Sequence, residues 1–302
     1  MRVVIAGGTG FLGRPLTTSL LQDKHDVVVL TRGRNAHIAA GAQSVPWDPN
    51  GDPGPWAAAI DGAQAVVNLA GESIAGKRWT VAQKERILES RVRATRSLVA
   101  AIGGAVAPPS VFVSGSAVGY YGPLGDAPAT EETPVGDDFL AHVCEQWERE
   151  AMRAAGGRTR VACIRTGIVL HKDGGALPEM LPPFRIGAGG PVGSGRQYWP
   201  WIHRDDWIAL VRWTIETPAA SGAINATGPH PVTNAAFARA LGRAMHRPAW
   251  LPAPAFALKL LLGEMAEALL LSGQNALPAK ATRGRFQFRY NTVDDALRAI
   301  FV

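Results

Sequence analysis

The start of the chain constrains its fold most, because an apolar run leads there directly into a glycine-rich turn. Residues 2–6, Arg-Val-Val-Ile-Ala, are rich in β-branched side chains, which is typical of a buried strand in a parallel sheet. The turn follows at residues 7–13, and Pro15 suits the first turn of a helix. The sequence therefore predicts a strand, a tight turn and a helix with no loop between them.

Three glycines in this turn have the spacing Gly-x-x-Gly-x-x-Gly, and each has a physical role. Gly7 permits the turn, Gly10 lets backbone N–H groups approach a pyrophosphate, and Gly13 lets the helix pack closely on the sheet. A glycine triplet alone is a weak indication, but the strand before it and the helix after it favour dinucleotide binding over a purely structural turn. The expected pyrophosphate loop also contains the residues between the glycines, Thr9, Phe11 and Leu12.

A second apolar strand, residues 26–30, ends at Thr31 and Arg32. The residues at this position in a dinucleotide-binding fold usually contact the ribose 2′-hydroxyl of NAD or the 2′-phosphate of NADP. Proteins that bind NAD commonly carry Asp or Glu at this point. Arg32, with Arg34 two residues on, could instead hold a 2′-phosphate bidentately, and no carboxylate stands there to repel it. We therefore expect NADP rather than NAD as the cofactor; the alternative is that Arg32 is merely solvated.

Two more apolar strands should end beside the same turn, because the carboxyl ends of parallel strands share one edge of the sheet. Residues 63–69 lead into Ala70 and Gly71, which are small enough for the chain to pass close to a cofactor. Residues 111–113 lead into a serine-rich stretch, whose hydroxyl groups could bind a substrate oxygen or simply bond to the backbone. The expected cofactor residues at this edge are Asn68, Leu69, Ala70, Gly71 and Ser114, and the expected catalytic residue is Ser116.

Helical and strand patterns alternate as far as about residue 170. Apolar spacing predicts helices over 80–102 and 139–155 and a strand over 160–165, before residues 171–199 become dense in glycine and proline. We therefore expect an α/β fold, a doubly wound parallel Rossmann sheet with a smaller C-terminal lobe on the substrate side. The expected bounds are 1–170 for the NADP-binding domain, to which 200–246 return, and 171–199 with 247–302 for the lobe. Within the lobe we expect a leucine-rich helix, a strand over 284–290 and a last helix from Thr292.

Composition narrows the possible partners. The formal charge of +6 suits anionic ligands, but the basic residues form no block, so we expect no nucleic-acid partner. The seven histidines lack the spacing of metal ligands, and two cysteines, Cys144 and Cys163, imply no disulfide framework, so we expect no metal and a reducing cytoplasm. A strand that begins at residue 2 leaves no room for a leader peptide.

The most apolar long stretch is residues 256–271. It contains Lys259, Glu264 and Glu267 and is too short to span a bilayer, so we expect no membrane partner. A buried or interface helix explains the stretch better, and a homodimer is one possible consequence.

Together these landmarks resemble the extended short-chain dehydrogenase/reductase superfamily over nearly the whole chain. The shared features are the glycine turn, the run Asn68-Leu69-Ala70-Gly71, the serine-rich strand end before Tyr121, and the run from Trp201 to Asp206. The chain is most similar to an atypical, sugar-epimerase-like subfamily with a C-terminal domain of unassigned function. The narrower markers are residues 78–79, 90–92, 117–122, 138–144 and 262–265. The resemblance implies a Rossmann fold, NADP binding and a cleft of the nucleotide-sugar type, but no particular substrate.

The chain departs from the superfamily at the acid-base pair Tyr-x-x-x-Lys, in which the Tyr hydroxyl relays a proton and the Lys lowers its pKa. None of the four tyrosines is followed by Lys four residues later. If the helix is aligned by Glu148, Leu140 falls at the Tyr position and Cys144 at the Lys position. Arg91 falls where the family commonly has Asn.

Three hypotheses follow. In the first, the protein is an NADP-dependent epimerase or reductase for a nucleotide sugar or small carbonyl compound, in which Tyr120 or Tyr121 beside Ser116 supplies the phenol and Arg91 the positive charge. In the second, it binds NADP(H) without turnover, as a redox sensor. In the third, it is an interaction module that uses its apolar C-terminal helix. Cys144 could be a nucleophile, but a buried helical cysteine is more often inert.

Overall fold

A parallel β-sheet forms the centre of the computed structural model, which describes residues 1–33 and 38–302. Within this part of the chain seven strands pair in the order β3-β2-β1-β4-β5-β7-β11, all of them parallel. Their bounds are β1 Arg2–Ala6, β2 Asp26–Thr31, β3 Gln43–Pro46, β4 Ala65–Asn68, β5 Val111–Ala117, β7 Arg160–Thr166 and β11 Gly222–Ala226. The strand order reverses between β1 and β4, which is the point where ligands bind in such sheets. The predicted doubly wound sheet is confirmed.

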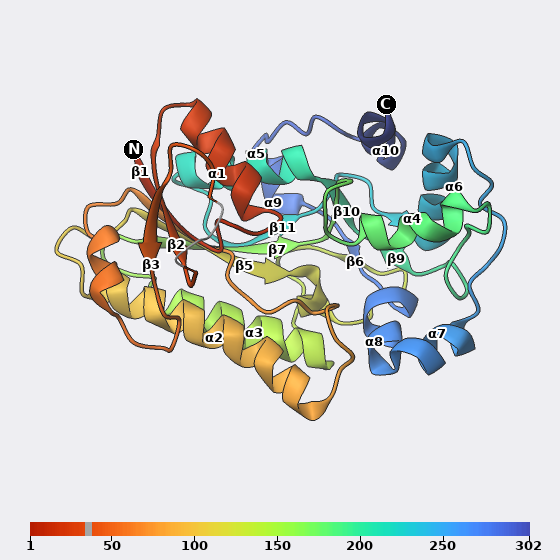
Figure 1. Ribbon diagram of the computed structural model, residues 1–302, viewed down its shortest axis with the longest axis horizontal. Coiled ribbons are helices and arrows are strands. Elements are labelled where there is room, and N and C mark those ends of the chain that lie inside the picture. Colours follow the sequence, from red (N-terminus) through yellow and green to blue (C-terminus); the bar gives the residue numbers. More distant parts are fainter. Residues whose placement is uncertain (34–37) are drawn as a thin grey trace.

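Helices cover both faces of the sheet (Figure 1). Helices α1 (Gly13–Gln22) and α5 (Arg204–Glu216) lie on one face, and α2 (Val81–Gly103) and α3 (Phe139–Met152) on the other. The inner strands are mainly apolar because both of their faces are buried: Val3, Val4 and Ile5 of β1 are fully buried. Two apolar cores result, one on each side of the sheet.

Capping side chains fix where the main helices begin. The hydroxyl of Thr80 accepts the N–H of Gln83 at the start of α2, and the carboxylate of Asp138 accepts the N–H of Ala141 at the start of α3. The helices predicted over 80–102 and 139–155 are therefore found close to the predicted bounds, and the second ends three residues earlier than predicted.

The smaller lobe lies beyond the carboxyl edge of the sheet, at the right of Figure 1. Its core contains Trp199, Trp201, Phe237 and Leu297 and is built mainly from α4 (Leu177–Arg185), α6 (Asn234–Met245) and α10 (Val293–Phe301). The strands here are short: β6 Pro128–Ala129, β8 Ile168–Leu170, β9 Tyr198–Trp199, β10 Trp201–His203, β12 Val232–Thr233 and β13 Asn275–Ala276. The other helices of the C-terminal part are α7 Ala255–Leu262, α8 Glu264–Ala266 and α9 Ala279–Arg283. The described residues also form the 3-10 helices η1 Pro55–Ala59 and η2 Val118–Tyr121 and the π-helix η3 Glu267–Leu271.

The apolar stretch 256–271 is not one helix. Gly263 has a φ of +65°, a conformation that glycine tolerates best, and it separates α7 from α8. Met265 after the break packs on Trp79 and Ile87 of the Rossmann domain. In contrast, no side chain of α7 is buried, so this helix is an exposed apolar surface rather than a core element.

The strand predicted over 284–290 is wrong. The backbone N–H groups of Arg289 and Tyr290 donate to the two carboxylate oxygens of Asp206, at 2.8 and 3.0 Å, instead of to a neighbouring strand. Aromatic residues such as Phe286 recur at every second position in this segment, and they pack against the α5 side of the core without a β ladder. Periodicity alone therefore suggested a strand where a side chain satisfies the backbone.

Hydrogen bonds join the C-terminal segment to the sheet edge. The side chain of Asn225, at the end of β11, donates to the carbonyl of Leu277, at 2.8 Å. Glu131 accepts the backbone N–H groups of both Asn225 and Lys280 through one carboxylate oxygen, at 3.0 and 3.1 Å. The strand pair β6–β13 lies beside these contacts.

Candidate cofactor and substrate site

The glycine turn closes so tightly that two of its positions accept only glycine. Gly7 has a φ of +80°, and a Cβ there would lie 2.7 Å from the carbonyl carbon of Leu69. A Cβ on Gly13 would lie 2.2 Å from the carbonyl oxygen of Gly7. A Cβ on Gly10, in contrast, would meet only the Gly7 carbonyl oxygen, at 3.3 Å, among the described residues. The turn is therefore packed inward at Gly7 and Gly13 and open at Gly10, where a ligand has room.

The N-terminus of α1 follows this turn and fits an anion. Leu12 occupies the cap position, and within the described residues no side chain caps it and no acidic residue stands in the first turn. Gly10 is exposed, and Thr9, Phe11 and Leu12 are half-buried. The partial positive charge of the helix end is thus left for a ligand.

The end of β2 lies next to this turn, since Ala6 and Leu30 are in register. Thr31 is buried and its hydroxyl accepts the backbone N–H of Gly33, at 3.3 Å. Arg32 is exposed to solvent at the strand end. Arg34, the second arginine of the prediction, lies outside the described residues.

On the other side of β1, the end of β4 is held by its own side chains. The amide of Asn68 is buried; it donates to the hydroxyl of Thr95, at 2.9 Å, and its oxygen accepts the N–H of Ala70, at 3.2 Å. Leu69 donates its backbone N–H to the carbonyl of Ala6. Asn68 therefore shapes the strand end, while Ala70 is half-buried and Gly71 exposed.

Arg91 of α2 reaches the same strand end. Its guanidinium donates to the carbonyls of Glu72 and Ile87, at 3.0 and 2.9 Å, and lies 5.2 Å from the ring centre of Trp147. A Cβ on Gly71 would lie 3.3 Å from the Arg91 side chain. Burial lowers the pKa of Arg91. Its charge lies beside the expected cofactor path, but two of its donors are used by the backbone.

The two predicted serines have different environments. Ser114 is fully buried within β5, and its hydroxyl donates to the carbonyl of Gly115, at 3.2 Å. Ser116 lies at the carboxyl end of the strand, and its hydroxyl donates to Oε1 of Glu148 on α3, at 2.6 Å. Only Ser116 therefore takes part in a side-chain network at this edge.

Glu148 is held by an arginine that the sequence analysis did not single out. Arg165, on β7, donates from Nε and Nη2 to the two carboxylate oxygens of Glu148, both at 2.8 Å, and only 4% of its side chain is exposed. Burial alone would lower the pKa of Arg165, but the hydrogen bonds and charge of Glu148 raise it. The available signal was an arginine at the end of an otherwise apolar strand, since a buried charge requires a partner.

The two predicted tyrosines, Tyr120 and Tyr121, differ in how deeply they are buried. The hydroxyl of Tyr121 is buried; it donates to Oδ1 of Asn225, at 2.6 Å, and accepts from Arg165, at 3.1 Å. Burial raises the pKa of Tyr121 to about 12. Tyr120 is half-buried, and the Arg165 guanidinium lies 3.4 Å from its ring centre. Tyr121 is thus part of the buried framework, whereas the ring of Tyr120 stacks on Arg165, which holds the carboxylate that Ser116 contacts.

The positions of the absent Tyr-x-x-x-Lys pair are filled by apolar groups. Leu140 lies against Gly119 and belongs to an apolar cluster that includes Met265. Cys144 is buried beside Ser116, and burial raises its pKa to about 12, so the thiol stays protonated and is no nucleophile.

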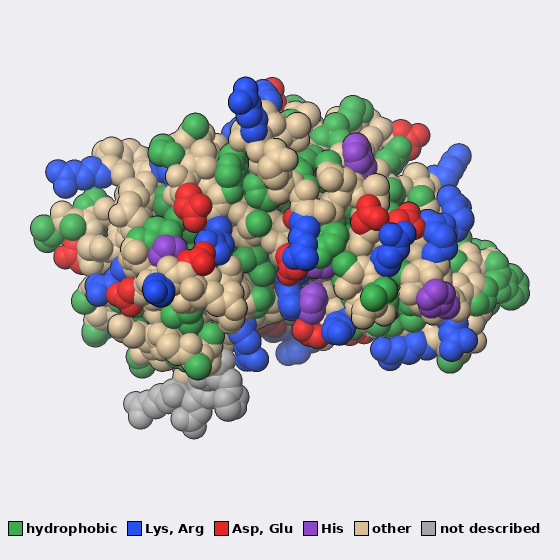
Figure 2. Space-filling model, turned by 90° about the horizontal axis from the view of Figure 1, so that it is seen from above, with side chains coloured by type: hydrophobic (Ala, Val, Ile, Leu, Met, Phe, Trp, Pro, Cys, Tyr) green, Lys and Arg blue, Asp and Glu red, His purple; other side chains and the backbone are tan. Residues whose placement is uncertain are grey.

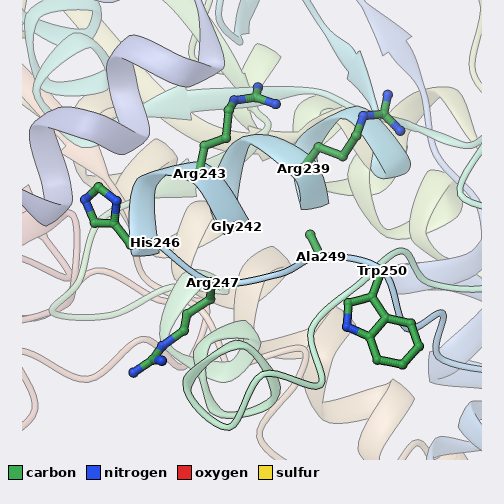
Figure 3. A pocket seen from close by; sticks show the side chains of 7 residues that line it. All are labelled: Arg239, Gly242, Arg243, His246, Arg247, Ala249 and Trp250. Carbon is green, nitrogen blue, oxygen red and sulfur yellow. The ribbon is translucent and has the colours of Figure 1, made fainter.

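Two hollows lie outside this region. One, of about 550 Å³, adjoins the end of α6, and the side chains that line it diverge, with Arg239 and Arg243 pointing to one side and Arg247 to the other (Figure 3). The other, of about 700 Å³, runs between α1 and α5 and includes Arg204 and Arg212. Figure 2 shows basic side chains interspersed with acidic ones over this face of the molecule.

The described residues contain neither a cluster of metal ligands nor a membrane-spanning helix. No group of three or more His, Cys, Asp or Glu side chains that could hold a metal ion is found in the described part of the chain. Among the helices of residues 1–33 and 38–302, none combines the length and apolar character that crossing a membrane requires.

Comparison with known proteins gives matches over nearly the whole chain. A model described as the NAD dependent epimerase/dehydratase family matches residues 3–227, and one described as a domain of unknown function (DUF1731) matches residues 253–300. A protein of Arabidopsis thaliana, named epimerase family protein SDR39U1 homolog, chloroplastic, is 45% identical over 303 residues, which cover 99% of this chain and 86% of that protein.

Two solved structures are also similar. The crystal structure of human epimerase family protein SDR39U1 with NADPH is 36% identical, with a TM-score of 0.90 and 99% of both chains covered. The nucleoside-diphosphate sugar epimerase of Corynebacterium glutamicum is 33% identical, with a TM-score of 0.80 over 100% of this chain and 58% of that one.

Proposed function

The chain belongs to the NAD-dependent epimerase/dehydratase family, and on this premise we propose that it binds NADP(H) at the glycine turn between β1 and α1. The observation that carries this proposal is the shape of the turn, which is closed at Gly7 and Gly13, open at Gly10, and followed by a helix end without a side-chain cap. Backbone N–H groups in such a turn hold a pyrophosphate.

Arg32 is the residue that we assign to the 2′-phosphate. Its exposed guanidinium stands at the end of β2, next to the turn, and can pair bidentately with a phosphate. The presence of NADPH in the crystal structure of the human relative supports this choice of cofactor. Ala70 and Gly71 line the remaining cofactor path in this proposal, and Arg91 contributes positive charge beside it.

The cofactor, when bound, would supply reversible oxidation of an alcohol to a carbonyl group. In the chemistry that we propose, Ser116 orients the reacting oxygen and Tyr120 is the remaining phenol, while the ion pair of Glu148 and Arg165 holds Ser116 in place. The proposed substrate class is a nucleotide sugar or a small carbonyl compound, and the relative named a nucleoside-diphosphate sugar epimerase supports the first of these.

A second candidate is an NADP(H)-binding protein without turnover. Leu140 and Cys144 leave the usual acid-base positions without a group that exchanges a proton near neutral pH, and the hydroxyl of Tyr121 is buried in the core. Such a protein would report the redox state of its cofactor through a change of partner or assembly. The proposed homodimer and cytoplasmic location stay predictions in either case.

The deciding experiment first mixes the purified protein with NADPH and follows the cofactor fluorescence; absence of binding would refute the proposal. A panel of nucleotide sugars and small carbonyl compounds is then tested for NADPH oxidation. Oxidation that is lost in both Ser116→Ala and Tyr120→Phe supports the enzyme. Tight cofactor binding without turnover, with an assembly state that differs between NADP and NADPH, supports the sensor.

A further inference from the structure

The hydrogen bond between Ser116 and Glu148 has a fixed direction. Ser116 Oγ lies 2.6 Å from Oε1 of Glu148, and Glu148 is the acidic partner of a salt bridge. A carboxylate in an ion pair can only accept hydrogen bonds, so the hydroxyl of Ser116 has to donate. The one proton of this hydroxyl is therefore committed to Glu148.

The carboxylate cannot turn away from Ser116, because Arg165 holds both of its oxygens at 2.8 Å. Arg165 is fixed in turn. Its Nη1 donates to the hydroxyl of Tyr121, at 3.1 Å, and to the carbonyl of Glu131, at 3.3 Å. All of these partners come from the buried framework of the sheet and its flanking loops, so the acceptor next to Ser116 is built in.

Only lone pairs remain on Ser116 Oγ for a ligand, since a hydroxyl has one donor and two acceptor positions. The neighbouring thiol of Cys144 stays protonated because burial raises its pKa, and the sulfur of a thiol is a much weaker acceptor than the Glu148 carboxylate, so the Ser116 proton stays with Glu148. A carbonyl oxygen next to Ser116 Oγ could form no hydrogen bond with it, because both oxygens would offer only lone pairs. A ligand hydroxyl could instead donate its proton to Ser116 Oγ.

From this polarity we infer that Ser116 recognises its ligand as a hydrogen-bond acceptor, and that the ligand group it binds best is a hydroxyl rather than a carbonyl. The inference rests on the proposed function, which places the reacting oxygen at the carboxyl end of β5. Glu148 and Arg165 are positioning residues in this account, since they act through Ser116.

The test compares cyclohexanol with cyclohexanone, which have nearly the same shape and differ at one oxygen. Both are titrated by NMR into protein saturated with 1,4,5,6-tetrahydro-NADP, a chemically inert cofactor analogue, so that neither compound reacts. We expect wild type to bind the alcohol about fivefold more tightly, which corresponds to one neutral hydrogen bond. Ser116→Ala should remove this preference. Equal affinities in wild type, a preference for the ketone, or binding of neither compound would overturn the inference.

A double variant tests the cause of the preference. Glu148→Leu with Arg165→Met removes the whole ion pair, a change that a buried pair tolerates better than the loss of one partner. It frees the Ser116 proton, so the alcohol preference should fall to about one or reverse. A preference that persists in a variant with normal cofactor binding would overturn the role of Glu148. If the double variant does not fold, the comparison of wild type with Ser116→Ala still tests whether Ser116 causes the preference for the alcohol.

The outcomes separate this inference from the proposed function. Loss of cofactor binding in wild type contradicts the proposed function, whereas intact binding of the NADP analogue with no preference for the alcohol contradicts only the inference about Ser116.

Discussion

The backbone at Gly13 presses against the carbonyl of Gly7, so that a Cβ on Gly13 would lie 2.2 Å from that oxygen. We expect Gly13→Ala to lower the free energy of unfolding by about 1–3 kcal/mol, because backbone atoms cannot move aside as a side chain can. Gly10→Ala is the matched variant: its Cβ meets only the Gly7 carbonyl oxygen, at 3.3 Å, among the described residues. It should keep its stability within about 1 kcal/mol and lose NADPH affinity about tenfold. Denaturant unfolding and NADPH titration of both variants test this, and a Gly10→Ala protein with unchanged affinity would argue against a pyrophosphate at the turn.

Charge reversal at Arg32 tests the choice between the two dinucleotides. Arg32→Glu should weaken NADPH binding by about 30- to 100-fold, because a charge-assisted pair with phosphate is lost and a repulsion takes its place. NADH, which lacks the 2′-phosphate, should bind nearly as before. Arg247→Glu, the same change on the distant lobe, is the control. If Arg32→Glu weakens both cofactors equally, the assignment of the 2′-phosphate is wrong.

The adjacent tyrosines should respond differently to removal of one oxygen. Tyr121→Phe leaves Oδ1 of Asn225 without its donor in the core, so we expect a loss of about 1–3 kcal/mol in the free energy of unfolding. Tyr120→Phe should cost less than about 1 kcal/mol, since that side chain is half-buried and its ring can still stack on Arg165. Urea unfolding measures both. Equal losses would mean that the Tyr121 hydroxyl is not a framework contact.

Stability should fall in mildly acidic solution because of His203. Burial lowers the pKa of His203 to about 4, and its neutral ring accepts the N–H of Asp205 at the start of α5. Between pH 6.5 and pH 4 the unfolded chain binds a proton at His203 that the folded protein does not bind. The free energy of unfolding therefore keeps its full value above pH 6.5 and declines by up to about 3 kcal/mol as the pH falls toward 4. His203→Asn, which can still cap the helix, should flatten this part of the profile. An unchanged slope in that variant would assign the acid sensitivity to other groups.

Helix α7 allows a direct test of the expected homodimer. Leu261 is 71% exposed, whereas Leu269 packs in the apolar cluster with Met265. Leu261→Asp should convert a dimer to a monomer in sedimentation experiments without changing the melting temperature, while Leu269→Asp should lower that temperature. A wild-type protein that sediments as a monomer would exclude the dimer.

The elements of the sheet were predictable because their signals are local. The apolar strands and the glycine turn each lie within a few residues of the structure that they specify. The segment 284–290 was not, because its backbone is satisfied by Asp206, some eighty residues earlier in the chain.

The hydrogen-bond network around Ser116 could not be predicted from the sequence for a related reason. Glu148 and Arg165 stand on different elements, and only the packing of α3 against the sheet brings them together. The sequence indicated Ser116 as a candidate but could not indicate the direction of its hydrogen bond, which depends on that pairing.

The contacts of Asn225 and Glu131 with residues 277 and 280 have a consequence for how the protein unfolds. The Glu131 carboxylate and the Asn225 amide bind the segment matched by the family model of unknown function to β11, the last strand of the sheet. The sheet and this segment should therefore unfold as one cooperative unit. Calorimetry should record a single heat-absorption peak, and a fragment ending before residue 253 should aggregate rather than survive as an autonomous module.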